Sequence, residues 1–246
     1  MTVVAGTPHA PAAGRSPRAA VWKRRAARLA GAAALVGASA VVSLAWAHPL
    51  TRPLAGFCCW YTPGRLSHGA LWTLPGSALL LPRLHMLGPT TFMAAALFLP
   101  YVMVAGTRRA LTAFFAGHVV ATAAVAAVVL PAAAWGWPPA VVVRNASDVG
   151  ASAGLAAAAG ALAVHLRWRP GGRLLGVALV VWFGSSLVVT QRLVEIEHLL
   201  ALATGAATDR WGRRPVDEIL RVSLRRRDAG NTLGTGGRAE GHDDEP

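Results

Sequence analysis

The feature that most constrains this chain is a series of long apolar runs with few charged residues. They lie at about 29–47, 84–105, 110–134, 149–166, 174–191 and 193–208. Each is close to the roughly 20 residues that a helix needs to cross the hydrocarbon core of a bilayer. With 54% apolar and only 14% charged residues, the chain is also too apolar for an ordinary soluble domain. The sequence therefore predicts an all-α, polytopic membrane protein with six transmembrane helices.

Basic residues lie mostly outside these runs, and the chain carries a formal net charge of +13. Lys and Arg are enriched in cytoplasmic loops, and this bias sets orientation. With the N-terminus inside, most loop arginines fall on the inner side, namely Arg108, Arg109, Arg167, Arg169, Arg173, Arg210, Arg213 and Arg214. We therefore expect a multi-pass protein of the cell membrane with both termini cytoplasmic. The charge predicts contact with anionic lipids at the cytoplasmic face. The sequence contains no folded basic domain that would support binding to a nucleic acid, so no nucleic-acid partner is expected.

The chain divides into a membrane domain and two tails. Residues 1–28 and 210–246 are expected to be disordered cytoplasmic tails, the first of them basic, and residues 29–209 to form the six-helix domain. The first apolar run follows a basic stretch, as in a cleaved signal peptide, but its length favours a retained anchor. Cys58 and Cys59 are adjacent, which disfavours a disulfide between them. The pattern implies no metal and no cofactor, and it leaves the oligomeric state open.

A serine and a histidine near the starts of two apolar runs give the sharpest chemical hypothesis. Ser152 lies four residues after Asp148, and His198 lies three residues after Glu195. Under six-span topology both helices enter from the outer face, so at roughly 1.5 Å per residue both side chains lie about 5 Å below the same surface. A neutral imidazole within hydrogen-bond reach can take the proton of a serine hydroxyl and activate it as a nucleophile.

Small residues near both positions predict close packing of these two helices. Gly150 and Gly154 allow another backbone to approach, and Ala201 with Gly205 forms a matching ridge of small side chains. Such packing would bring the hydroxyl and the imidazole together.

A simpler interpretation stays open for both residues. A run of Gly, Ala and Ser in a transmembrane helix can be a packing surface only, with Ser152 bonded to the carbonyl four residues earlier. His198 can belong to an interfacial polar cap together with Glu195 and Glu197.

Three segments match known motifs in order and spacing. Gly150-Ala151-Ser152-Ala153 is similar to a Gly-x-Ser-Gly nucleophile motif, and His198-Leu199-Leu200-Ala201-Leu202-Ala203-Thr204-Gly205 is similar to a His-x-x-Gly-x-x-x-Gly pattern. Leu71-Trp72-Thr73-Leu74 and Leu84-His85-Met86-Leu87-Gly88 are similar to the stretch leading into a second helix. Over about residues 27–210 the chain thus resembles the rhomboid family of intramembrane serine proteases. Gly117-His118-Val119-Val120-Ala121-Thr122 and Asp148-Val149-Gly150 resemble a compact actinobacterial-type branch.

The resemblance implies a six-helix rhomboid-like bundle with a catalytic Ser152–His198 dyad and no third acidic member. Such an enzyme cuts single-span membrane proteins at the outer side of the bilayer, without metal or cofactor. The resemblance also implies that the backbone N–H of the nucleophile and His85 stabilise the oxyanion, and it assigns Gly150 to the motif that supports the serine.

Several positions depart from the family pattern. Pro89 stands where an oxyanion asparagine is expected, Ala153 replaces the glycine after the nucleophile, and Ala156 replaces an aromatic that packs on the histidine. Ala201 replaces the first glycine of the helix-six pattern. Loss of one oxyanion donor costs about 10²- to 10³-fold in turnover. Two rivals therefore stand beside the protease: a catalytically inactive rhomboid pseudoprotease that binds transmembrane helices, and a small transporter or channel.

Overall fold

The computed structural model describes residues 17–190 and 192–212, and within them the chain is helical with no strand. Four helices are long and apolar enough to cross a membrane, namely Ala20–Ala47, Leu84–Ala105, Thr107–Ala134 and Pro170–Thr190. The prediction of an all-α fold is therefore confirmed, and these four long apolar helices suggest a membrane-embedded protein. Two further helices lie at the positions of the remaining apolar runs, Ser152–His165 and residues 193–212.

The first helix, α1 (Pro17–Ala47), begins earlier than the sequence analysis expected. Residues 17–28 belong to this helix, so the prediction of a disordered tail over 1–28 is wrong for them, whereas 1–16 lie outside the described residues. The stretch from Arg18 to Leu29 has no Gly, and Ala and Arg are strong helix formers, so the helix extends beyond its apolar part. At the other end, residues 210–212 are helical and 213–246 lie outside the described residues.

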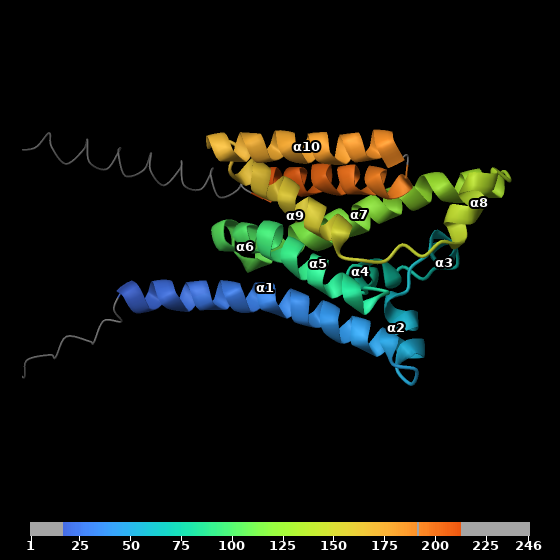
Figure 1. Ribbon diagram of the computed structural model, residues 1–246, viewed down its shortest axis with the longest axis horizontal. Helices are drawn as coiled ribbons and strands as arrows, with labels where there is room; N and C mark the ends of the chain where they lie inside the picture. Colours follow the sequence, from blue (N-terminus) through green and yellow to red (C-terminus); the bar gives the residue numbers. More distant parts are fainter. Residues whose placement is uncertain (1–16, 191, 213–246) are drawn as a thin grey trace, which may run out of the picture.

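Three short helices fold the connection between the first two long helices onto the bundle. They are α2 (Arg52–Cys59), α3 (Pro63–Ser67) and α4 (Thr73–Ser77). The Arg65 guanidinium ties α3 to α2, since its Nη1 donates to the carbonyls of Gly56 at 2.7 Å and Trp60 at 2.6 Å. Cys58 and Cys59 are free thiols. This connection, residues 48–83, covers the end of the bundle opposite the start of α1 (Figure 1) and buries Tyr61, Thr73, Ser77, Leu80 and Leu81.

The second long helix is a composite of four segments. It consists of η1 (Leu84–Met86), α5 (Leu87–Met93), the π-helical η2 (Ala94–Phe98) and α6 (Leu99–Ala105). Pro100 has no N–H to donate to the preceding turn, and a π turn directly before it absorbs the irregularity. The helix thus continues past Pro89 and Pro100 over the whole predicted run 84–105.

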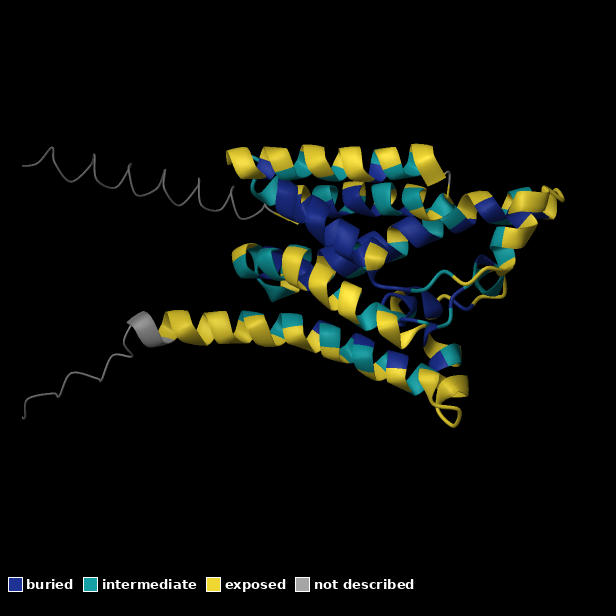
Figure 2. Ribbon diagram, viewed as in Figure 1, coloured by how far each residue is buried: buried dark blue, intermediate teal, exposed yellow. Residues whose placement is uncertain are grey.

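The central element of the bundle is the short helix α9 (Ser152–His165). Around it lie α7 (Thr107–Ala134), which leads into α8 (Pro138–Asn145), and α10 (Pro170–Thr190). Eleven of its residues are buried, and Figure 2 shows it as the darkest ribbon of the bundle. At about 1.5 Å per residue its 14 residues cover about 20 Å, less than the roughly 30 Å hydrocarbon core.

The close packing predicted around α9 is present and involves Gly205 as predicted, but on α9 Gly160 takes part instead of Gly154. A Cβ atom at Gly205 would collide with the carbonyl of Ala157, and one at Gly160 with the carbonyl of Leu202. The helix of residues 193–212 therefore lies against α9 backbone to backbone. Gly154 instead faces the ring of Phe114 on α7. The prediction that Gly154 packs against the Ala201/Gly205 ridge is therefore wrong.

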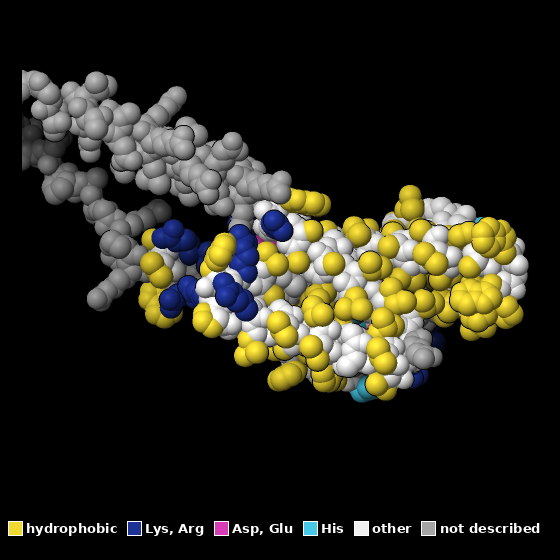
Figure 3. All heavy atoms as spheres, turned by 90° about the horizontal axis from the view of Figure 1, so that it is seen from above, with side chains coloured by type: hydrophobic (Ala, Val, Ile, Leu, Met, Phe, Trp, Pro, Cys, Tyr) yellow, Lys and Arg dark blue, Asp and Glu magenta, His cyan; other side chains and the backbone are white. Residues whose placement is uncertain are grey.

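Charge and a buried carboxylate mark one end of the bundle. Asp209 is 2% exposed; the Tyr101 hydroxyl donates to its Oδ1 at 2.9 Å, and Nδ1 of His165 lies 3.0 Å from the same oxygen. Arg109 donates to the Gly212 carbonyl at 3.2 Å. Figure 3 shows Lys and Arg side chains gathered at this end, where α1 also begins (Figure 1).

We predict that Gly205→Val destabilises the fold, because its methyl groups would overlap the α9 backbone. Overpacking of this kind costs about 1–3 kcal/mol. Gly184→Val on α10 is the matched control, since a Cβ atom there meets nothing within 4 Å. Unfolding of the detergent-solubilised protein measures both, and equal losses in the two variants would contradict the backbone contact.

Candidate functional site

Ser152 is the first residue of α9, at the point where an irregular segment turns into the helix. Two backbone bonds anchor this segment to the connection between the first two long helices. Asp148 N–H donates to the Tyr61 carbonyl at 3.1 Å, and Gly150 N–H donates to the Ser77 carbonyl at 2.9 Å. Gly150 has φ +140°, a conformation that favours glycine. The Ser152 side chain is exposed. The segment thus presents the serine at the edge of the buried core.

His198 lies near the start of the helix of residues 193–212, with its ring centroid 5.1 Å from that of Phe183 on α10. Its Nδ1 lies 3.4 Å from Oε2 of Glu195, one turn earlier on the same helix. Within the described part of the chain, its Nε2 is buried and has no hydrogen-bond partner. If Nδ1–H donates to the carboxylate, Nε2 carries the lone pair, which is the form a general base requires.

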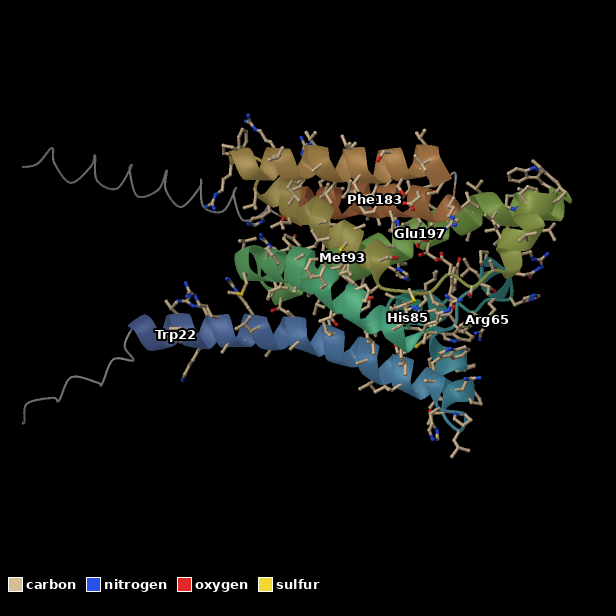
Figure 4. The ribbon with its side chains drawn as sticks, in the orientation of Figure 1. Trp22, Arg65, His85, Met93, Phe183 and Glu197 are labelled. Carbon is tan, nitrogen blue, oxygen red and sulfur yellow. The ribbon has the colours of Figure 1, made fainter. Side chains whose placement is uncertain are left out.

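One cavity of about 240 Å³ joins the two residues. Ser152 and His198 both line it, together with Leu81, Met86, Pro89, Thr90, Met93, Val149, Gly150, Ala151, Leu155, Ala156 and Phe183. Figure 4 shows Met93 on α5 and Phe183 on α10 on the two flanks of this region. The structure therefore brings together the serine and the histidine that the sequence analysis selected, in a mostly apolar space with few polar groups.

Gly150 lines the cavity as a supporting residue, but His85 does not. The His85 side chain is exposed on η1 (Figure 4), and the α5 side of the cavity is formed by Met86, Pro89 and Thr90 with Met93. Positions 86, 89, 90 and 93 follow the helical repeat of one face, and position 85 falls to the side of it. The position of His85 gives no support to its expected role as an oxyanion donor.

Two residues of the site were not predicted to have their observed roles. Phe183 takes the packing position on the histidine that the family pattern gives to residue 156, which is Ala156 here, and it is 8% exposed. A tertiary contact between two apolar runs gives no sequence signal. Glu195 orients the imidazole, and its i, i+3 spacing to His198 was a signal that could have found it. The arrangement therefore has an acidic member that the resemblance did not imply.

A second layer of polar groups lies next to the segment that carries Ser152. Nε2 of His118 on α7 lies 2.8 Å from the Ser77 hydroxyl, and His118 is 1% exposed. The Thr122 hydroxyl, also on α7, donates to Oε1 of Glu197 at 2.6 Å. These bonds fix α4, α7 and the helix of residues 193–212 around the serine.

The cavity thus has an exposed serine on one side and, on the other, an imidazole whose Nδ1 lies 3.4 Å from a carboxylate oxygen. Among the described residues, no group of three His, Cys, Asp or Glu side chains could hold a metal ion. Comparisons with protein-family models, curated proteins and solved structures find no match. A function for this protein is therefore inferred from its sequence, its fold and this cavity.

We predict that a cysteine at position 152 reacts quickly with a water-soluble, membrane-impermeant maleimide, because that side chain is exposed at the cavity. Ala153→Cys is the matched control, since Ala153 is 3% exposed and does not line the cavity. Both are made with Cys58 and Cys59 replaced by serine, and labelling is followed by mass spectrometry. Equal rates at positions 152 and 153 would show that the cavity is closed to water.

Proposed function

We propose that this protein is a rhomboid-like intramembrane serine endopeptidase, built as a six-helix bundle, that hydrolyses peptide bonds of single-span membrane proteins. Ser152 is the nucleophile and His198 the general base. The single observation that carries the proposal is the shared cavity, which Ser152 and His198 both line. Among the described residues, Nε2 of His198 has no hydrogen-bond partner.

The reaction follows from the roles of these groups. Nε2 of His198 takes the hydroxyl proton as Oγ of Ser152 attacks the peptide carbonyl, and the imidazolium then gives that proton to the leaving amine. Glu195 accepts from Nδ1–H and stabilises the imidazolium. A water molecule, deprotonated by the same nitrogen, then attacks the acyl-enzyme carbonyl and releases the acid and the free serine.

The oxyanion is stabilised by the start of α9. N–H groups in the first turn of a helix have no partner within the helix, and Ser152 and Ala153 occupy this turn. The helix dipole adds a partial positive charge at the same point. These backbone donors replace the side-chain donors that Pro89 and the exposed His85 do not supply.

Substrate and water reach the cavity from different sides. Residues of α5 and α10 line it, and both helices expose large apolar side chains such as Phe92, 71% exposed, and Trp182, 70% exposed. A transmembrane substrate enters between these helices from the lipid, and water enters from the outer surface. The basic end of the bundle faces the cytoplasm and its anionic lipids, so both termini lie on the inner side of the cell membrane.

A second candidate is a pseudoprotease that binds transmembrane helices without cutting them. A specific feature favours it: an apolar groove of about 580 Å³ lies between α1 and the α5–α6 region, lined by Leu29, Ala32, Ala33, Val36, Gly37, Thr91, Ala94, Ala95, Phe98 and Leu99. In addition, no hydrogen bond in the described part of the chain joins Ser152 to His198. Catalytic bonds often tighten only with substrate bound, so the protease remains the first candidate.

We predict that a fluorophosphonate serine probe labels the purified protein at Ser152. Labelling is abolished in Ser152→Ala, which lacks the attacking oxygen, and falls at least ~10²-fold in His198→Ala, which lacks the base. Mass spectrometry of the labelled peptide and cleavage of a single-span reporter protein in liposomes measure the two activities.

Ser185→Ala is the matched control, because the Ser185 hydroxyl on α10 is exposed and bonds to the Trp182 carbonyl of its own helix. It should label and cleave like the wild type. Absence of labelling and cleavage in the wild type, with reporter binding retained, would favour the pseudoprotease.

A further inference from the structure

Another cavity lies beside the serine segment, and two carboxylic acids are among its lining residues. It measures about 150 Å³ and is lined by Tyr61, Pro63, Val125, Val143, Ala146, Ser147, Asp148, Leu193, Val194 and Glu197. None of these lining residues, all in the described part of the chain, is Lys, Arg or His. The carboxyl groups of Asp148 and Glu197 lie within hydrogen-bonding reach of each other. Figure 4 labels Glu197 near the start of the helix of residues 193–212.

These two acids stand next to the two reactive residues. Asp148 lies four residues before Ser152, in the segment that leads into α9, and Glu197 directly precedes His198. Glu197 is 3% exposed, and the Thr122 hydroxyl donates to one of its oxygens. A contact between the acids therefore ties the segment that carries the nucleophile to the helix that carries the base.

Two negative charges so close together, away from water, would repel each other and lose their hydration. One proton held between them removes the repulsion and gives an O–H···O⁻ bond, one of the stronger hydrogen bonds in proteins. We propose that Asp148 and Glu197 share a single proton and that this pair is a positioning clamp, which holds the Ser152 segment in register with His198. The catalytic consequence of the clamp rests on the proposed function.

The other titratable groups near the pair come from α7 and the connection of residues 48–83. His118 on α7 interacts electrostatically with Asp148 and is bonded to Ser77. Burial raises the pKa of Tyr61 well above its usual value, and the charges of Asp148 and Glu197 raise it further. Tyr61 therefore stays neutral in mildly alkaline solution, where a histidine is neutral as well. When the pH rises, Asp148 and Glu197 are therefore expected to lose their shared proton while Tyr61 and His118 keep their charge state.

The clamp predicts a specific pH dependence of stability. The folded pair holds a proton that free carboxyl groups of the unfolded chain release at about pH 4. The stability that it contributes is therefore present in acid and is lost as the pH rises through the titration of the pair. Between about pH 7 and 10 the melting temperature of the full-length protein in detergent should fall by about 2–4 °C more in the wild type than in Glu197→Gln. The amide of Glu197→Gln supplies a permanent donor to Asp148 and cannot ionise.

Asp148→Asn is a second variant with the same expected loss of pH dependence, should Glu197→Gln fail to fold. Glu195→Gln is the matched control in the melting experiment, because Glu195 is an acid on the same helix outside this cavity, and it should keep the wild-type fall. An unchanged fall in both Glu197→Gln and Asp148→Asn would overturn the clamp. So would stabilisation of the wild type by added Na⁺ or Ca²⁺ at constant ionic strength, because a bound cation would then hold the pair.

Labelling of Ser152 at different pH values tests whether the acid pair positions the serine segment. The rate of fluorophosphonate labelling at Ser152 should decline in the wild type over the pH range in which the melting temperature falls, and it should persist to higher pH in Glu197→Gln. Identical labelling profiles would overturn the positioning role. If the wild type is not labelled at any pH, the proposed function fails, and the melting experiment still decides whether the pair shares a proton.

Discussion

The fold depends on the close approach of three helix backbones at its centre. Gly117 of α7 lies against Ala157 of α9, and Gly205 of the helix of residues 193–212 lies against the same residue. In a membrane, helices gain nothing from hiding apolar side chains from lipid, so packing at short distance is what holds them together. The packing of the whole bundle therefore depends on the Ala- and Gly-rich composition of α9.

This packing also explains how polar groups are kept inside a membrane protein. The helix α9 is too short to cross a bilayer, and the irregular segment that carries Asp148 and Gly150 leads into it at Ser152. The segment's backbone groups bond to the connection of residues 48–83 at Tyr61 and Ser77, since irregular backbone inside a bilayer must be satisfied by protein. Histidine and acidic side chains from α7 and the last helix then meet the segment in a small, partly dry space.

The helices themselves were predictable from the sequence, and the site was predictable in part. Apolar runs located the long helices within a few residues, except that α1 starts at Pro17 because helix propensity continues beyond the apolar stretch. Ser152 and His198 were found from their spacing to acidic residues at the helix starts. Depth in the bilayer follows from sequence position, because the rise per residue is fixed.

Other features were not predictable from single runs of sequence. Which glycine meets which helix depends on helix rotation, so Gly160 faces the last helix while Gly154 faces Phe114. The same rotation turns His85 away from the cavity and brings in Pro89 and Thr90. Phe183 was missed because nothing on α10 distinguishes a residue that contacts His198 from its lipid-facing neighbours.

By itself, the sequence determined that this chain is helical, that it belongs in a membrane, and that a serine and a histidine lie at similar depth. These properties follow from composition and from distances along one helix axis. The tertiary structure alone decided that the two side chains line one cavity, that Phe183 and Glu195 hold the imidazole, and that Asp148 meets Glu197. Those contacts join helices distant in sequence, and their relative rotation is set by side-chain packing across the bundle rather than by any single segment.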